Sequence, residues 1–227
     1  MLTGSASEEL VGLVVLRAAG DDILAALDHP VQDFLAAQLP GMAVDFKVTT
    51  DLGTRRIARA AFEYAKQNGK THLSVVTKAN IMKKTDGKFT AICHEIAKDY
   101  PGITVEDYYI DIMTANLIKE PLREKFQVVL LPNLYGDIIT DEAAQIQGGV
   151  GTAGSANIGD RYAMFEAIHG SAPRMLEEGL GDYANPASIL KAEAMLLRHI
   201  CCTEAAEKLE AALQNCQVTK IAINSCS

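Results

Sequence analysis

The feature that most constrains the fold is an alternation of short apolar runs with helical patterns that starts near Met42. Residues 42–50, MAVDFKVTT, alternate apolar with polar or small side chains, which is typical of a strand. Residues 51–69 repeat apolar side chains at helical spacing and end at Gly69, a common helix stop. Residues 73–80, LSVVTKAN, indicate another strand. Strands that alternate with helices in this way predict an α/β architecture.

The alternation continues to an uninterrupted apolar run at residues 128–133, VVLLPN. Before that run, residues 87–102 place apolar side chains on one helical face and end in Pro101 and Gly102, which predicts a second helix. Residues 114–122 indicate a further helix. Because unbroken apolar runs are typical of strands that are covered on both faces, VVLLPN predicts a buried strand.

The sequence changes character at residues 148–160, GGVGTAGSANIGD, which we interpret as a glycine-rich connector followed by a mostly helical segment. A chain of 227 residues can form one large or two small domains, and we place a domain boundary after residue 148. Residues 20–41 could form one helix or two helices broken at Pro30.

Three glycines in the connector satisfy the pattern GxGxxG: Gly149, Gly151 and Gly154. A dinucleotide-binding fingerprint needs a strand before this pattern and a helix after it. The residues before it, TDEAAQIQ, have a helical pattern, so we reject a Rossmann assignment and expect a turn-rich connector.

The formal net charge of −8 argues against nucleic acid as a partner, because nucleic-acid binders concentrate Lys and Arg. Small molecules are the expected partners. If such a ligand is itself anionic, local positive charge or a metal ion must offset the charge of the chain.

The cysteines are odd in number and form no CxxC pair, so neither a zinc site nor a disulfide framework is indicated. They are Cys93, Cys201, Cys202, Cys216 and Cys226. This usage favours a reduced, cytoplasmic protein. No apolar run approaches the ~20 residues that cross a bilayer, and the first residues lack a basic leader, so we expect neither membrane insertion nor secretion.

Two aspartates, Asp137 and Asp141, lie four positions apart directly after the predicted buried strand. On a helix they would share one face, where like charges are mildly destabilising. One interpretation is that Asp137 caps the helix and Asp141 complements its positive end. The other is that a divalent cation such as Mg²⁺ or Mn²⁺ binds between them, since such ions prefer oxygen ligands.

Lys78 and Asn80 lie at the end of the predicted strand at residues 73–80, at the sheet edge where α/β proteins bind ligands. A surface lysine is usually only solvated, and we expect this of Lys83, Lys84 and Lys88. His169 lies between an apolar stretch and a loop, where a lone histidine is more often structural than functional.

Six ordered motifs together resemble the isocitrate and isopropylmalate dehydrogenase family of metal-dependent β-decarboxylating dehydrogenases. The motifs are TKANIMK, YYIDIMTANL, NLYGDIITDEAAQIQGGVG, SANIGD, FEAIHGSAP and YANPASILKAEAMLLRH, and the resemblance covers about residues 42–212. It implies the two-domain α/β fold of that family. SANIGD and FEAIHGSAP favour the isocitrate branch over the isopropylmalate branch.

The resemblance also implies a role for each candidate residue. Asp137 and Asp141 would bind Mg²⁺ or Mn²⁺, and Asp111 would reach the same ion from the neighbouring subunit of a homodimer. Lys78 would be the catalytic lysine, acting with Asp111 across the dimer interface. Asn80 would lie beside the substrate and the nicotinamide.

The implied cofactor is NAD or NADP. Its adenosine end would be lined by His169, Gly170, Ser171, Ala172 and Asn185. Arg174 stands where NAD-dependent members often carry an acidic residue, so it could pair with a ribose 2′-phosphate and favour NADP.

The implied reaction is the metal-dependent oxidative decarboxylation of isocitrate to 2-oxoglutarate, with hydride transfer to the nicotinamide. The metal would chelate the substrate hydroxyl and its adjacent carboxylate, lower the pKa of the alcohol and stabilise the enolate left by decarboxylation. Lys78 would assist the proton transfer. A tricarboxylate substrate on a chain of net charge −8 also fits the need for a cation.

The N-terminal part of the family pattern has no counterpart in this sequence, including the serine- and arginine-bearing segment that binds substrate carboxylates. The tyrosine expected as general acid is absent from residues 7–15, SEELVGLVV. We therefore expect residues 1–148 to form mostly the smaller, dimer-forming domain, with the metal and catalytic lysine residues. Residues 149–227 would be the remaining C-terminal part of the larger, cofactor-binding domain.

Two classes of function stay open on these grounds. One is an isocitrate dehydrogenase-like enzyme, or a related 3-isopropylmalate-type dehydrogenase. The other is a non-catalytic structural or regulatory member of the family.

Overall fold

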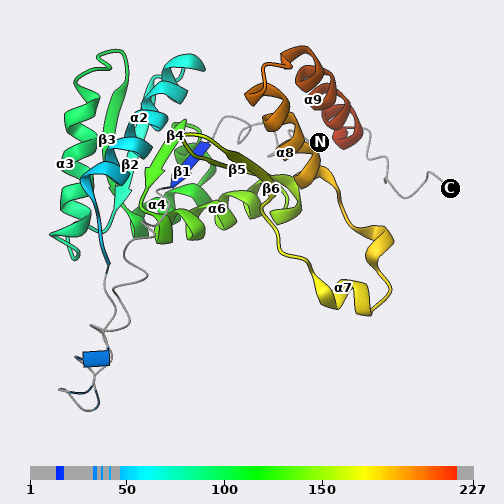
Figure 1. The fold of residues 1–227 in the computed structure, drawn as a ribbon, viewed down its shortest axis with the longest axis horizontal. Helices are drawn as coiled ribbons and strands as arrows, with labels where there is room; N and C mark the ends of the chain where they lie inside the picture. Colours follow the sequence, from blue (N-terminus) through cyan, green and yellow to red (C-terminus); the bar gives the residue numbers. More distant parts are fainter. Residues whose placement is uncertain (1–13, 18–32, 35–36, 38–40, 42–46, 219–227) are drawn as a thin grey trace. The chain divides into compact units, whose positions relative to one another are not determined.

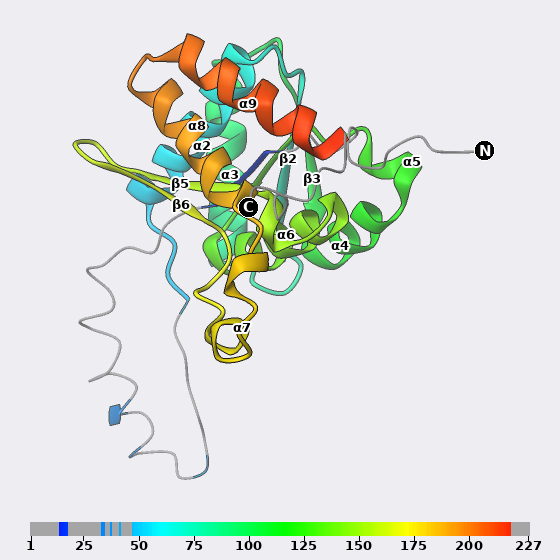
Figure 2. The ribbon, with the colours of Figure 1, turned by 90° about the vertical axis from the view of Figure 1, so that its right-hand side faces the viewer.

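The computed structural model describes residues 14–17, 33–34, 37, 41 and 47–218, and it divides the chain into two compact units (Figures 1 and 2). Unit 1 comprises Met1–Ala143 and unit 2 comprises Ala144–Ser227. The division falls a few residues before the boundary we placed after residue 148. The roles assigned to the two domains stay predictions.

In the described part of unit 1, four strands form a sheet in which every neighbouring pair is parallel. The strand order is β1 (Val14–Arg17), β4 (Val128–Leu131), β2 (His72–Thr77) and β3 (Thr104–Tyr109). All four residues of β4 are buried, as its uninterrupted apolar sequence predicts. The sheet, with helices between its strands, confirms the predicted α/β class.

Within residues 47–218, the helices that belong wholly or mainly to unit 1 are α2 (Asp51–Gln67), α3 (Thr85–Ala97), α4 (Ile110–Ile118), α5 (Glu120–Arg123) and α6 (Asn133–Gln147). The main core joins α2 and α3 to one face of the sheet, where alternate residues of β2 and β4 are buried. Its members include Ala58, Phe62, Leu73, Val75, Phe89, Ile92, Val128 and Leu130. In Figures 1 and 2, α4 and α6 lie on the other side of this sheet.

Helix α2 is capped at its start and ends at the predicted glycine stop. The Thr50 side chain accepts a hydrogen bond from the backbone N–H of Gly53 at 3.2 Å, which satisfies one of the free donors of the first turn. At the other end Gly69 has φ +63°, and the N–H of Lys70 donates to the carbonyl of Ala65 at 2.8 Å. A glycine in this left-handed conformation lets the chain leave a helix without side-chain strain.

The predicted elements of unit 1 have mixed outcomes. The helices expected at 51–69 and 87–102 and the strands expected at 73–80 and 128–133 are present, with shifted ends. The helix expected at 114–122 is instead the end of α4 followed by α5.

Two predictions near the N-terminus fall largely outside the described residues. The strand at 42–50 overlaps them only at residues 47–50, which have no regular structure, so that end of the prediction is wrong. The helices at 20–41 lie almost entirely outside them.

Unit 2 contains an antiparallel hairpin of β5 (Gly154–Ile158) and β6 (Ala163–Ala167), together with helices α8 (Ala187–His199) and α9 (Thr203–Val218). Shorter elements are η1 (Val150–Thr152), α7 (Pro173–Glu177) and η2 (Gly181–Tyr183). The long helices confirm the helical pattern near the end of the sequence. The hairpin corrects our interpretation of residues 148–160 as a connector alone, since β5 forms within them.

The hairpin packs closely on α8. A Cβ added at Gly154 would lie 2.6 Å from the backbone nitrogen of Ala192, so only glycine fits there without a shift. The buried hydroxyl of Ser188 donates to the carbonyl of Ala153 and accepts from the N–H of Ile168 at 3.2 Å. Because α6 precedes the GxGxxG pattern and a strand follows it, rejection of the Rossmann assignment is confirmed.

Among the described residues, no helix combines the length and the apolar character that crossing a bilayer requires.

Candidate functional site

Four of the candidate residues follow the carboxyl ends of three neighbouring strands in unit 1. Lys78 comes directly after β2, and Asp111 is the second residue of α4, which begins where β3 ends. Asp137 and Asp141 lie in α6, which follows β4. Because these strands are parallel, their carboxyl ends meet at one edge of the sheet, which is where open α/β sheets bind ligands.

Lys78 and Asp111 form an ion pair at this edge. The distance from Lys78 Nζ to Asp111 Oδ1 is 2.7 Å, with side-chain exposures of 25% and 59%. The hydrogen bond from Lys78 is the main cause that lowers the pKa of Asp111 below its usual value. Lys78 Nζ also lies 5.9 Å from the centroid of the Tyr109 ring. The two predicted catalytic residues therefore meet within one chain.

The aspartates of α6 do not cap the helix. Because α6 starts at Asn133, Asp137 lies beyond the first turn, in which no acidic residue stands. The capping interpretation of Asp137 is therefore wrong for this helix. Both side chains are exposed, and their spacing of four residues places them on one face, one turn apart.

The chemistry of the three aspartates fits a hard divalent cation, since carboxylate oxygens are the ligands that Mg²⁺ and Mn²⁺ prefer. Their positions within one chain do not complete such a site. Among the described residues, which include Asp111, Asp137 and Asp141, no three His, Cys, Asp or Glu side chains lie close enough to bind one ion together.

A small cavity of about 290 Å³ lies between the carboxyl ends of β2 and β3 and helix α3. It is lined by Thr77, Ala79, Thr90, Asp107, Tyr108 and Tyr109. His94 of α3 contacts the carboxylate of Asp107, with Nε2 at 2.8 and 2.9 Å from its two oxygens. The cavity borders the loop that carries Lys78, so this edge of the sheet offers both space and polar groups.

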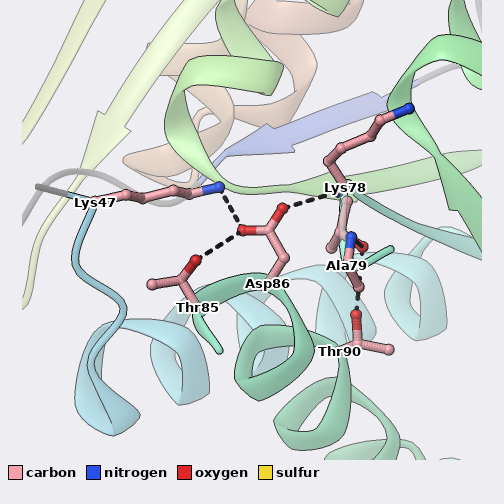
Figure 3. A network of polar contacts seen from close by, with 7 residues as sticks. Lys47, Lys78, Ala79, Thr85, Asp86 and Thr90 are labelled. Atoms are coloured by element: carbon pink, nitrogen blue, oxygen red, sulfur yellow. Dashed lines mark hydrogen bonds and ion pairs between the residues drawn. The ribbon is translucent and has the colours of Figure 1, made fainter. Parts of the chain in front are cut away.

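A buried carboxylate lies beneath the same loop (Figure 3). The side chain of Asp86, in the first turn of α3, is fully buried. Its Oδ2 accepts a hydrogen bond from the backbone N–H of Lys78 at 2.8 Å, and its Oδ1 forms an ion pair with Lys47. Lys47 Nζ also lies 4.2 Å from the centroid of the Tyr135 ring of α6. Burial raises the pKa of Tyr135, against a lowering effect of Lys47.

The sequence-based interpretation missed Asp86 and Lys47. Their contact joins residues that are 39 positions apart, which no spacing rule reveals. Asp86 stands just before the predicted helix at 87–102, where an acidic residue is ordinarily read as favourable to the helix dipole and solvated. Its full burial, which the sequence does not show, is what distinguishes it.

The residues predicted to line the adenosine end of the cofactor lie in unit 2. His169, Gly170 and Ser171 follow β6, and Ala172 precedes α7 with a left-handed φ of 46°. Their described polar contacts are local: His169 Nδ1 lies 2.9 Å from the carbonyl oxygen of Gly170. Asn185 precedes α8, and its side-chain oxygen accepts from the N–H of Ala187 at 3.0 Å.

Arg174 lies in the first turn of α7. Its side chain is 87% exposed and pairs with Glu178, one turn further on, at 2.8 Å. Exposed pairs of this kind contribute little to stability, so the guanidinium can exchange this partner for another anion. Asn80, the remaining predicted cofactor residue, lies in unit 1 in the turn after Lys78.

Comparison with known proteins gives consistent results. The family model for isocitrate/isopropylmalate dehydrogenase matches residues 3–222. The isocitrate dehydrogenase [NADP] of Rickettsia prowazekii is 44% identical over 190 residues, which are 84% of this chain and 37% of the relative. The 3-isopropylmalate dehydrogenase of Archaeoglobus fulgidus is 44% identical over 168 residues, which are 74% of this chain and 50% of the relative.

A crystal structure of isocitrate dehydrogenase from Methylococcus capsulatus has a similar fold, with a TM-score of 0.71 at 42% identity. The match covers 76% of this chain and 49% of that structure. The chain thus spans about half or less of the length of these proteins.

Proposed function

Because the chain belongs to the isocitrate/isopropylmalate dehydrogenase family, we propose that it serves the metal-dependent oxidative decarboxylation of isocitrate to 2-oxoglutarate, with NAD or NADP as hydride acceptor. The observation that carries this proposal is the Lys78–Asp111 ion pair at the carboxyl edge of the sheet. The pair joins the one lysine and one of the three carboxylates that this chemistry needs.

Lys78 would act on protons at the substrate. Because Asp111 forms an ion pair with Lys78, it would orient Nζ toward the substrate hydroxyl. Asp111 would also help to hold the cation, and Nζ of Lys78, once released by Asp111, would exchange a proton with the substrate oxygen. The exposure of Asp111 leaves room for this exchange of partners.

Asp137 and Asp141 would hold Mg²⁺ or Mn²⁺, with Asp111 as the third carboxylate. When bound, the ion would supply Lewis-acid polarisation of the substrate oxygens and offset the charge of a tricarboxylate. Their exposed positions on one face of α6 leave both carboxylates accessible to an ion.

The three carboxylates do not meet within one chain, so we propose a homodimer whose active sites are shared between subunits. Helices α4 and α6, which carry them, both expose large apolar side chains that a second copy could cover. Ile112 and Ile118 of α4 and Leu134 and Ile138 of α6 are each at least half exposed. Burial of such side chains between subunits would favour association.

In unit 2, the segment from His169 to Arg174 would bind the adenosine end of the nicotinamide cofactor. The nicotinamide supplies the hydride chemistry, and the protein fixes its position. Arg174 would favour NADP by pairing with the 2′-phosphate in place of Glu178. A cytoplasmic location is part of the proposal, since none of the described cysteines forms a disulfide.

A coupled assay tests the enzymatic part of this proposal. The purified chain would be given isocitrate or 3-isopropylmalate, Mn²⁺ and each nicotinamide cofactor, and reduced cofactor would be followed by absorbance. Lys78→Met should lower kcat by about 10²–10⁴-fold, the usual contribution of a general acid or base. Lys83→Met, which changes an exposed lysine of the same loop, is the matched control and should keep full activity.

The metal site has its own test, which does not depend on turnover. Asp137→Asn should weaken Mn²⁺ binding, measured by electron paramagnetic resonance, by at least about tenfold, since even indirect loss of ligand support has an effect of that size. Asp99→Asn, at an exposed aspartate away from the site, is the control. A folded chain that binds Mn²⁺ in this way but turns over neither substrate would favour the non-catalytic alternative. Equal Mn²⁺ affinities would remove Asp137 from the metal site.

A further inference from the structure

The buried carboxylate of Asp86 calls for a physical explanation. Taking a carboxylate out of water is costly unless a charge partner and hydrogen bonds replace the lost water. Asp86 lies in the first turn of α3, where a carboxylate interacts favourably with the positive end of the helix dipole. An exposed aspartate gains the same interaction, so this position alone does not explain why Asp86 is fully buried.

The first contact of Asp86 fixes the backbone that presents Lys78. Oδ2 accepts from the N–H of Lys78, the first residue after β2, at 2.8 Å. The loop then closes on itself, because the N–H groups of Ile81 and Met82 donate to the carbonyl of Lys78 at 2.9 and 2.8 Å. The Asp86 N–H donates in turn to the carbonyl of Met82 at 3.0 Å. Both ends of the loop are therefore attached to the start of α3.

The side chain of Lys78 points away from this anchor. Figure 3 shows its ammonium directed to the opposite side from Asp86, and the carboxylate of Asp86 contacts Lys78 through the backbone N–H. The Nζ of Lys78 is then available for Asp111 at 2.7 Å. The two carboxylates thus have separate tasks: Asp86 contacts the main chain of Lys78, and Asp111 contacts its side chain.

The second contact of Asp86 connects this loop to α6. Lys47, whose side chain is 24% exposed, neutralises the buried carboxylate and lies 4.2 Å from the centroid of the Tyr135 ring. Tyr135 stands two positions before Asp137 in α6. An ammonium over an aromatic ring is attracted by the ring, so Lys47 contacts both α3, through Asp86, and α6, through Tyr135.

We propose that Asp86, with Lys47 as its counter-ion, is a positioning residue that fixes the main chain from which Lys78 reaches Asp111. The roles of Lys78 and Asp111 belong to the proposed function, on which this inference rests. Because Asp86 is fully buried, it would not itself contact a substrate or a cofactor. Its effect on chemistry would pass through the backbone of Lys78.

Two double variants isolate the acceptor role of Asp86 from its charge. Asp86→Asn/Lys47→Met and Asp86→Ala/Lys47→Met remove the same two charges, so neither leaves an unpaired buried ion. The asparagine variant keeps a side-chain oxygen that can accept from the Lys78 N–H, and the alanine variant does not. The matched control is Glu95→Gln, which breaks the exposed Arg55–Glu95 pair between α2 and α3 and leaves the Lys78 loop untouched.

Hydrogen exchange of single amides gives a readout that needs no enzymatic activity. The Lys78 amide should exchange about tenfold faster in the alanine double variant than in the asparagine one, which corresponds to one lost hydrogen bond. The Val76 amide, inside β2, should exchange equally in both. Equal exchange of the Lys78 amide in the two variants would overturn the proposal, whether or not the chain is an active dehydrogenase.

Kinetics give the second readout where turnover is found. The alanine double variant should lower kcat by about 10–100-fold, the effect of misplacing a catalytic group by about an ångström, while the KM for the nicotinamide cofactor stays unchanged. The asparagine double variant should recover most of this loss, and Glu95→Gln should show none. A loss of stability without a change in kcat would make Asp86 a structural residue only. Absence of turnover in the parent chain would count against the proposed function, and the exchange result would still decide the role of Asp86.

Discussion

The two regions that carry the candidate residues are built in opposite ways. In unit 1, Lys78 is attached through its backbone to a fully buried carboxylate and through its side chain to Asp111. In unit 2, His169 and Arg174 lie exposed between β6 and α8. Their described polar contacts are with residues that are close to them in the sequence.

This contrast suggests a division of labour. A group that moves a proton must stand in place before the substrate arrives, because small displacements reduce the rate strongly. A segment that binds a large cofactor can become ordered by the contacts that the cofactor brings, at some expense in affinity. We therefore expect unit 1 to be rigid around Lys78 and unit 2 to be adaptable around Arg174.

The largest expected difference between the regions is in stability. Leu130→Ala removes a fully buried side chain of β4 and should lower the free energy of unfolding of unit 1 by about 2–5 kcal/mol. Leu176→Ala, in α7, changes a side chain that is 66% exposed and should stay within about 0.5 kcal/mol of the parent. Urea denaturation, with hydrogen exchange to resolve the two units, measures both. Similar losses of unfolding free energy in the two variants would contradict the contrast between a rigid unit 1 and an adaptable segment in unit 2.

A substitution at Gly154 tests whether the hairpin and α8 of unit 2 are as adaptable as the segment around Arg174. Because an added Cβ would meet the backbone of Ala192 at 2.6 Å, Gly154→Ala should destabilise the packing of β5 on α8 by about 1–3 kcal/mol. Gly102→Ala, where nothing lies within 4 Å of the added atom, is the control. Faster hydrogen exchange in α8 would show that the packing of β5 on α8 cannot adjust to the added atom. The adaptable part of unit 2 would then be limited to the segment around α7. No change would mean that the hairpin and α8 also yield readily.

Arg174→Ala tests the exposed segment for cofactor selectivity. Loss of a charged hydrogen bond to the 2′-phosphate should weaken NADP binding about tenfold and leave NAD binding unchanged. Arg161→Ala, at another exposed arginine of unit 2, is the matched control. Isothermal titration calorimetry gives both affinities. If NAD and NADP weaken alike, Arg174 does not contact the 2′-phosphate.

The smallest effect concerns the titration of Asp111. Its folded pKa is lowered, chiefly by Lys78, so its contribution to stability is present above the usual value of 3.8 and is lost as the pH falls through the lowered folded value. Lys78→Met should return the pKa of Asp111 toward the usual value, as read by carbon NMR, and Lys83→Met should not. If the pKa of Asp111 is the same in Lys78→Met as in the parent, the two side chains are not paired in solution.

Sequence patterns predicted the elements whose signals are local. The Gly69 stop marks the end of α2, and the unbroken apolar run marks β4. Strand β3 escaped prediction because it lies at the sheet edge, where Glu106 and Asp107 interrupt the apolar pattern. The hairpin of β5 and β6 was hidden by glycine and alanine, which carry weak strand preferences.

The candidate site was predictable only in part, because the contacts that support it join segments far apart in the sequence. The order of motifs pointed to Lys78, Asp111 and Asp137, whose residue types the chemistry requires. What supports them did not appear in the sequence, because the contact of Lys47 with Asp86 depends on the packing of distant segments. Burial turned an ordinary helix-terminal aspartate into a candidate positioning residue.

The place of β3 at the end of the sheet has a consequence for handling the protein. Among the described strands it pairs only with β2, so its outer edge carries backbone groups that a foreign strand could join. The exposed carboxylates of Glu106 and Asp107 stand along this edge, and two such edges would bring like charges together. Acid or high salt, which removes or screens these charges, should therefore promote fibrous self-assembly through β3 before the core of the sheet unfolds.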